Sequence, residues 1–241
     1  MERRHRPGYT ARDIVLHERL NQVEERIQRA AARAGRQRSD ITLIAVTKKF
    51  APQVILDAYD LGLRHFGENY VQEFEAKHPA VSHLKDAEFH LIGHLQSNKT
   101  RIAASLFQVI ETIDSAKLAR RLNESLDPLR PSLEVMIEVK LSPEESKVGA
   151  DPTALPELID AIRACPRLRL TGLMTMPPWS DDPEQTRPYF RKLAALARSA
   201  GLPHLSMGMS HDFEAAIEEG ATHIRVGTAL FGPRPKPGAS L

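Results

Sequence analysis

The sequence has very little cysteine, few aromatic residues and no long apolar run. Its one cysteine, Cys165, excludes an internal disulfide and fits the reducing cytoplasm, which is where we expect the protein. No stretch of about 18 consecutive residues is apolar, so the sequence predicts no transmembrane helix. The first residues also lack the apolar stretch of a secretory signal, so we expect neither a signal peptide nor a membrane partner.

An excess of charge of one sign is absent as well. The chain has 33 Lys and Arg against 31 Asp and Glu, a net charge of +2. So small a net charge gives no overall electrostatic attraction to nucleic acid. Apolar residues make up 41% of its 241 residues, which suits one large α/β domain. We expect a disordered tail over residues 1–10, a single domain over residues 11–232, and a Pro-rich extended tail over residues 233–241.

Short apolar runs alternate with amphipathic segments along most of the chain. A first helix is predicted over residues 11–34, because Ile14, Leu20, Val23 and Ile27 recur at helical spacing. Eight strands are predicted at residues 41–46, 64–67, 89–92, 108–113, 133–139, 168–174, 204–207 and 223–226. Amphipathic segments between them lie at residues 52–61, 70–77, 98–106, 116–126, 153–164, 183–200 and 212–219.

This alternation predicts a parallel sheet, because parallel neighbours need a crossover connection, usually a helix. Eight units in about 200 residues favour closure into a single (β/α)8 TIM barrel with an extra N-terminal helix. An open doubly wound sheet is the alternative, although the early G-x-G-x-x-G of its dinucleotide-binding form is absent. In a TIM barrel, functional groups collect after the carboxyl ends of the strands.

Lys48 follows the first predicted strand. Ile44, Val46 and Lys48 share one face of that strand, so an inward face would put the amine in a poorly solvated barrel mouth. Loss of water and a nearby cation both favour the neutral amine, the form that attacks an aldehyde to give an imine. The alternative is a lysine that extends to solvent from a strand end.

The last two units have the features of a phosphate site. Ser210 is a natural N-cap for the segment at residues 212–219, and Gly227 and Thr228 follow the eighth strand. TIM barrels often bind phosphate with the loops after strands seven and eight. Two ordinary turns are the alternative, and Asp212 and Glu214 would have to face away from an anion.

Arg225 lies between Ile224 and Val226, so it points into the barrel if they pack against the helices. A buried guanidinium needs a partner. One such partner is the pyridine nitrogen of pyridoxal 5′-phosphate (PLP). Because arginine keeps its proton, that nitrogen would stay unprotonated and the ring would be a weaker electron sink. The other is an internal salt bridge, for example to Glu138.

The remaining polar clusters do not indicate a metal centre or a hydrolase. His90, His94 and His211 lie on different elements and have neither HxxxH nor CxxC spacing, so we predict no metal site. Ser210, His211 and Asp212 are consecutive, whereas a catalytic triad needs groups that converge in space.

Eight short motifs occur in order at the predicted strand ends. They are AVTK (45–48), FGENY (66–70), HLIGHLQSNK (90–99), TID (112–114), SKVG (146–149), GLMTMP (172–177), SMGMS (206–210) and RVGTALFG (225–232). With them the chain resembles the pyridoxal phosphate homeostasis proteins. These are relatives of the alanine racemase barrel, a PLP fold type III barrel, without its C-terminal β domain.

The resemblance implies that PLP is the cofactor and that Lys48 holds it as a Schiff base. It implies a phosphate site made of Ser210, Gly227 and Thr228, with Ser206 as a further contributor. Arg225 would face the pyridine nitrogen. Other residues would line the cofactor, namely Asn69, His90 and Met174.

The resemblance also implies that Lys147, at the mouth, takes part in moving PLP. There is one departure from the family. Many relatives carry a second lysine two positions after the Schiff-base lysine, and this chain has Phe50 there. That difference puts in doubt any relay of PLP through a lysine at this position.

A carrier that buffers PLP, or delivers it to PLP-dependent apo-enzymes, is the function that the resemblance favours, as a monomer or weak dimer. Racemases of this class use a C-terminal β domain to supply a second base across a dimer. Only residues 233–241 follow Gly232, so we expect no efficient racemase activity. Two alternatives stay open: a racemase-like PLP enzyme, and a Schiff-base aldolase or other phosphate-binding barrel without PLP.

Overall fold

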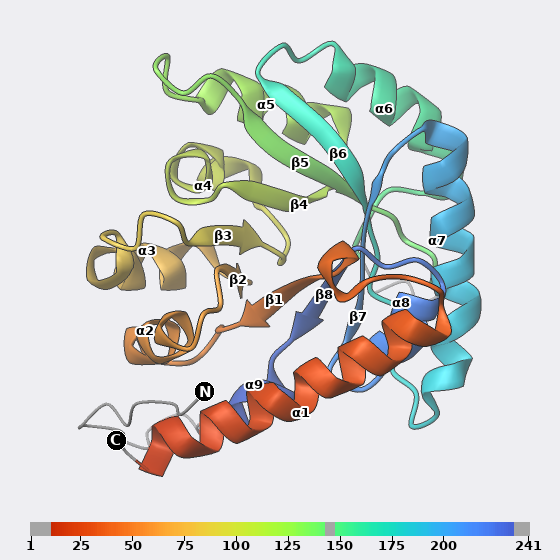
Figure 1. Cartoon of the computed structure of the whole chain (residues 1–241). Helices are drawn as coiled ribbons and strands as arrows, with labels where there is room; N and C mark the ends of the chain where they lie inside the picture. Colours follow the sequence, from red (N-terminus) through yellow and green to blue (C-terminus); the bar gives the residue numbers. More distant parts are fainter. Residues whose placement is uncertain (1–10, 143–147, 234–241) are drawn as a thin grey trace.

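A computed structural model of the chain describes residues 11–142 and 148–233. Its eight strands form a closed barrel in which each strand pairs in parallel with the next and β8 pairs with β1 (Figure 1). Helices connect the strands around the outside, and one more helix precedes β1. The predicted (β/α)8 barrel with an extra N-terminal helix is confirmed, and the closed order excludes an open doubly wound sheet.

Every predicted strand segment overlaps one strand of the barrel, and β2, β3 and β7 extend one or two residues beyond the predicted bounds. The strands are β1 (Thr42–Val46), β2 (His65–Glu68), β3 (Glu88–Leu91), β4 (Val109–Ile113), β5 (Leu133–Glu138), β6 (Leu168–Met174), β7 (His204–Met209) and β8 (His223–Val226). The α-helices are α1 (Ala11–Arg33), α2 (Pro52–Asp60), α3 (Val71–Val81), α4 (Thr100–Leu106), α5 (Ala116–Ser125), α6 (Leu155–Arg163), α7 (Arg187–Ala200), α8 (Phe213–Glu218) and α9 (Thr228–Phe231). Short 3-10 helices are η1 (Arg38–Asp40), η2 (Ser97–Lys99), η3 (Pro152–Ala154) and η4 (Pro183–Thr186).

Two helices depart from the predicted segments. Helix α3 continues beyond the expected end at residue 77 to Val81, although Pro79 lies in its last turn. The buried side chain of Val81 favours this extension, because it joins the same apolar core as Phe74. Helix α9 is a single turn directly after Gly227 that the amphipathic pattern is too short to indicate.

The main apolar core lies between the barrel and its helices. Phe74 of α3 packs against Phe89 of β3, with ring centroids 4.6 Å apart, and against Phe107 at 4.9 Å. Ile224 and Val226 of β8 belong to the same core, whereas Arg225 between them is hydrogen-bonded to β7. Strand alternation therefore turns Arg225 into the barrel, as the sequence indicates.

Helix α1 lies across the outside of the barrel and packs against α8 and α9 (Figure 1). No helix among the described residues is long and apolar enough to cross a membrane. The apolar face of α1 packs against the protein: its apolar residues, such as Val23 and Ile27, are buried in the core.

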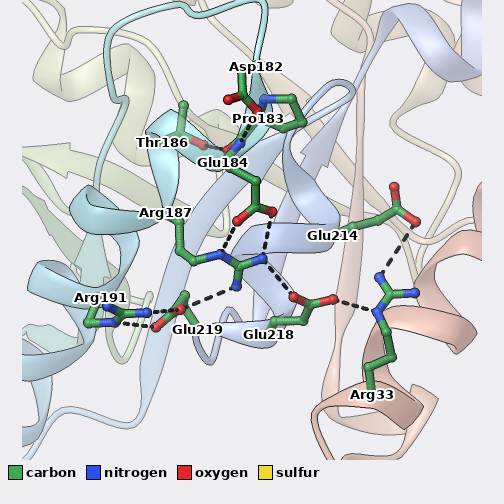
Figure 2. Close-up of polar contacts among 10 residues, drawn as sticks. All are labelled: Arg33, Asp182, Pro183, Glu184, Thr186, Arg187, Arg191, Glu214, Glu218 and Glu219. Atoms are coloured by element: carbon green, nitrogen blue, oxygen red, sulfur yellow. Dashed lines mark hydrogen bonds and ion pairs between the residues drawn. The ribbon is translucent and has the colours of Figure 1, made fainter.

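A network of ion pairs joins η4, α7, α8 and α1 (Figure 2). Arg187 of α7 binds Glu184 at 2.6 Å and Glu218 at 2.8 Å, and Glu218 also binds Arg33 of α1 at 2.6 Å. Arg187 further contacts Glu219 at 3.3 Å. Because α8 begins just after the turn that contains Ser210, this network holds the position of that turn.

We expect Arg187→Met to lower the free energy of unfolding by on the order of 1 kcal/mol, because partly exposed ion pairs contribute modestly. Burial opposes ionisation of Glu218, but hydrogen bonds from Arg187 and Arg33 lower its pKa overall. A carboxylate whose pKa is lowered in the folded state stabilises the protein above its unfolded pKa of about 4.3 and loses this effect as the pH falls below it.

Urea denaturation at neutral pH and at acidic pH checks this prediction. The difference between wild type and Arg187→Met should shrink in acid and in high salt. Arg198→Met, an exposed position on the same helix, is the matched control and should change stability little. Equal effects of the two substitutions would contradict a stabilising network.

Candidate cofactor-binding site

A cavity of about 530 Å³ lies at the carboxyl ends of the strands. Its volume is in the range of roughly 300–1,000 Å³ that small-molecule sites occupy. It is lined by residues at the ends of six strands or in the loops that follow them: Val46, Lys48, Phe50, Asn69, Ile92, Met176, Trp179, Met209, Ser210, His211, Arg225, Gly227, Thr228, Ala229 and Gly232. The barrel thus opens where the fold predicts a functional site.

Most of the predicted site residues meet in this cavity. Those that line it are Lys48, Asn69, Ser210, Arg225, Gly227 and Thr228. His90, Met174 and Ser206 are buried among the strands and are not part of its lining. Ser206 still touches the site, because it is bonded to Arg225. Lys147 lies outside the described residues.

A buried ion pair anchors the backbone beside Lys48. Lys77 of α3 is 5% exposed, and its Nζ donates to the backbone oxygen of Thr47 and to Glu68 Oε1, both at 2.9 Å. Thr47 Oγ1 donates to the same carboxylate at 2.8 Å. Since removing one partner of such a pair leaves an uncompensated buried charge, this cluster holds the β1–α2 turn strongly.

The next two residues of that turn are also constrained. Lys49 has a φ of 64°, a left-handed conformation that is uncommon for a residue with a side chain, and its backbone N–H donates to Glu73. Lys49 is exposed and does not line the cavity. Phe50 packs against Phe231 of α9 with ring centroids 5.6 Å apart, so an aromatic contact occupies the position of the family's second lysine.

The opposite wall is built from the loops after β7 and β8. Ser210 Oγ accepts hydrogen bonds from the backbone N–H groups of Gly227 and Ala229, both at 3.2 Å. Gly208 has a φ of 89°, and a Cβ there would come within 2.5 Å of the Ala216 side chain. Only glycine therefore allows β7 to approach α8 this closely.

The two acidic residues near this wall do not oppose an anion. Asp212 accepts a hydrogen bond from the Met209 N–H at 2.7 Å. Glu214 forms an ion pair with Arg26 of α1 at 3.0 Å, and Arg26 also lies over the Phe213 ring. Neither carboxylate lines the cavity, so both negative charges are directed to partners outside it.

Arg225 begins a chain of hydrogen bonds through the barrel interior. The residue is 3% exposed, and its guanidinium donates to Ser206 Oγ at 2.7 Å and to the Thr175 backbone oxygen at 2.8 Å. Ser206 donates to Glu111 at 2.5 Å, and Glu111 pairs with His90 Nδ1 at 2.9 Å. The predicted partner Glu138 acts at longer range: burial lowers the pKa of Arg225, and Glu111, Asp212 and Glu138 oppose that shift.

Glu111 is the residue that the sequence did not bring to attention. Burial alone would raise its pKa, but the hydrogen bond from His90 and the charges of His90 and Arg225 hold its pKa at about 2. The carboxylate is therefore ionised and compensates the buried cation. A single acidic residue inside the apolar run 108–113 was the available signal, because alternation turns it inward with Val109.

The charges and polar atoms of the cavity suit an anionic ligand that also carries a hydrogen-bond acceptor and a hydrogen-bond donor. Its described lining includes Lys48 and Arg225 and no Asp or Glu. Asn69 Oδ1 is buried without a hydrogen-bond partner, so it can accept from a ligand. At the mouth, the rings of Trp179 and His211 lie 4.9 Å apart, and both residues line the cavity. These features fit a phosphorylated pyridine aldehyde.

Comparison with known proteins agrees with this geometry. The sequence model of the alanine racemase N-terminal domain family matches residues 19–235. The pyridoxal phosphate homeostasis protein of Aquifex aeolicus is 45% identical over 223 residues, which cover 90% of this chain and 97% of the relative. The protein of the same name from Pseudomonas aeruginosa is 43% identical over 222 residues.

This chain belongs to the pyridoxal phosphate homeostasis protein family. Among solved structures, PipY of Synechococcus elongatus without PLP is 38% identical with a TM-score of 0.79, over 90% of this chain and all of PipY. PipY with PLP bound is 37% identical with a TM-score of 0.76. An alanine racemase from Clostridium difficile is 15% identical, with a TM-score of 0.69 over 58% of its length, and shares the barrel fold.

The hydrogen bonds that join Arg225, Ser206 and Glu111 inside the barrel predict how much stability the protein loses without the Ser206 hydroxyl. Ser206→Ala would leave an Arg225 N–H and a Glu111 oxygen facing a methyl group, so we expect unfolding to become easier by about 1–3 kcal/mol. Ser199→Ala, on the exposed face of α7, is the matched control and should stay within about 0.5 kcal/mol of wild type. Urea denaturation of PLP-free protein measures both, and equal values would argue against a buried Arg225–Ser206–Glu111 chain.

Proposed function

We propose that this protein binds PLP in the cavity at the carboxyl ends of the strands and acts in PLP homeostasis. The observation that carries the proposal is the lining of that cavity. One lysine from the first strand loop and an anion-binding wall from the last two strand loops share it, with no carboxylate among the described lining residues. The names of the relatives and the PLP-bound PipY structure support the same cofactor.

Lys48 is the residue that we propose holds the cofactor, as a Schiff base between its Nζ and the aldehyde carbon. A bound PLP supplies an electrophilic carbon and an aromatic ring, which the protein must orient. The Lys77–Glu68–Thr47 cluster would keep the Lys48 turn in place during binding and release. The apolar side chains of Val46 and Ile92 would limit water around the amine.

The phosphate would bind at Ser210, Gly227 and Thr228. Ser210 Oγ and the N–H groups of Gly227 and Ala229 now satisfy one another at 3.2 Å, and these long bonds can be exchanged for bonds to phosphate oxygens. Arg225 would face the pyridine nitrogen, because it lines the cavity while Ser206 and the Thr175 oxygen fix its guanidinium. Asn69 Oδ1 offers an acceptor to a ring hydroxyl.

The biological role that we propose is to hold PLP and to buffer it or release it to PLP-dependent apo-enzymes, as a monomer or weak dimer, without turning over an amino acid. The position of Phe50 bears on release. Its contact with Phe231 fills the place of a second lysine at the edge of the cavity. Release from Lys48 would therefore proceed without a lysine at that position.

Lys48→Ala should abolish the covalent cofactor adduct. Wild-type protein incubated with PLP and reduced with borohydride should carry a phosphopyridoxyl group on the peptide containing Lys48, because only an imine is reduced to a stable amine. Mass spectrometry of the digested protein measures this. Lys49→Ala is the matched control: it changes the adjacent lysine, which is exposed and outside the cavity, and should leave labelling intact.

Unchanged labelling in Lys48→Ala would move the cofactor to another residue, and a wild-type protein that binds no PLP would support a barrel without this cofactor. Sustained alanine racemisation by the wild type would instead favour the racemase-like alternative.

Ser210→Ala should weaken PLP binding about tenfold or more while leaving the affinity for pyridoxal, which lacks the phosphate, almost unchanged. The reason is that a charge-assisted hydrogen bond to phosphate is lost and no contact to the ring is touched. Absorbance titrations with the two aldehydes measure both affinities. Ser180→Ala, in the loop before η4 and outside the cavity, is the control. A parallel loss of affinity for both ligands would contradict a phosphate role for Ser210.

A further inference from the structure

The barrel has a second cluster of polar side chains, at the mouth opposite the proposed PLP cavity. His65 is the first residue of β2 and Glu88 is the first residue of β3. The two strands pair with His65 opposite Glu88, and alternation places His90 on the same face of β3 as Glu88. That face is the barrel interior, where His90 meets Glu111. The cluster therefore lies at the amino ends of the strands.

The distances in this cluster match those of a coordination site. His90 Nε2 lies 3.2 Å from His65 Nδ1 and 3.4 Å from Glu88 Oε1, and the last two atoms are 3.9 Å apart. A point about 2 Å from all three atoms exists within such a triangle, and Zn²⁺ binds imidazole nitrogen and carboxylate oxygen at about 2.0–2.2 Å. An ion would thus need little movement of the side chains.

Hydrogen bonding already orients the most buried ligand. A carboxylate such as Glu111 accepts hydrogen bonds, so with an ion on Nε2 the 2.9 Å bond between His90 Nδ1 and Glu111 would be donated by Nδ1. The other nitrogen, Nε2, faces His65 Nδ1 and Glu88 Oε1 and is the atom that would bind the ion. A carboxylate that fixes the tautomer of a ligating histidine is the usual outer partner in metal sites. Glu111 is in turn held by Ser206, at 2.5 Å.

Exposure of the three side chains would let an ion enter. His90 is 1% exposed, whereas His65 is 34% and Glu88 39% exposed, so the site is anchored in the barrel and open to solvent. Two imidazoles and one carboxylate leave the fourth position of a tetrahedral ion to water. This donor set suits Zn²⁺, Co²⁺ or Ni²⁺, whereas Mg²⁺ and Ca²⁺ prefer oxygen ligands.

We propose that His65, Glu88 and His90 form a binding site for a divalent transition metal of the Zn²⁺ class, separate from the PLP cavity. The sequence motifs for zinc do not reveal it, because the ligands come from two neighbouring strands and meet only through their register. Without an ion, His65 and His90 share one proton in a hydrogen bond. Metal binding replaces that hydrogen bond with two metal–nitrogen bonds, so the metal-free and metal-bound proteins differ at these two histidines.

The test is a titration of the untagged full-length protein with Co²⁺ and Zn²⁺. We expect one equivalent to bind by calorimetry, with visible d–d bands for Co²⁺ that Zn²⁺ abolishes. His65→Ala and Glu88→Gln should each weaken binding tenfold or more. His83→Ala, an exposed histidine just before β3, is the matched control and should bind like wild type. Mg²⁺ should give no heat of binding.

Lys48→Ala should bind the metal like wild type, in the presence and absence of PLP, so a failure of the PLP proposal would leave this result unaffected. Absence of Zn²⁺ and Co²⁺ binding to the wild type would overturn the metal site. Binding that persists unchanged in both His65→Ala and Glu88→Gln would overturn it too, because it would assign the metal to other residues.

Discussion

Arg225 is a cation buried in the barrel interior, and the arrangement of the interior follows from holding it there. Its guanidinium donates hydrogen bonds to Ser206 and to the Thr175 carbonyl, and the Ser206 hydroxyl in turn donates to the carboxylate of Glu111. Glu111 then orients His90. One line of hydrogen bonds thus runs from the carboxyl-end cavity toward the amino-end mouth. Because a buried charge without a partner is very unfavourable, each member of this line constrains the next.

A second buried charge acts on the opposite wall. Lys77 connects α3 to the β1–α2 turn through Glu68 and the Thr47 carbonyl, and so the loop that carries Lys48 is held from behind by a helix. The last two strand loops are held from outside by α1, through Arg26 and the ion pairs around Glu218. Contacts from outer helices therefore support both walls of the cavity, and such support is what a site needs if it is to hold a cofactor in a fixed orientation.

The two mouths of the barrel offer different chemistry. The carboxyl end presents cations, backbone N–H groups and an amide oxygen, a set that suits a phosphorylated aldehyde. The amino end presents two imidazoles and a carboxylate, a set that suits a borderline metal ion. This division follows from strand direction, since all eight strands run the same way and their ends contribute to different openings. Membership of the pyridoxal phosphate homeostasis protein family accords with the first mouth and says nothing of the second.

The sequence by itself determined the eight strands, the longer helices and their order, because the period of apolar residues reports which face of a strand or helix is buried. It also indicated five site residues, because each lies at or near the end of a predicted strand and has a side chain or backbone suited to binding a ligand. They are Lys48, Ser210, Gly227, Thr228 and Arg225. Only the tertiary structure decided which residues bond to one another in the barrel interior. Glu111, 95 residues before Ser206 in the chain, and His65, in register with Glu88, acquire their neighbours through strand pairing and barrel closure, and no local pattern encodes such contacts.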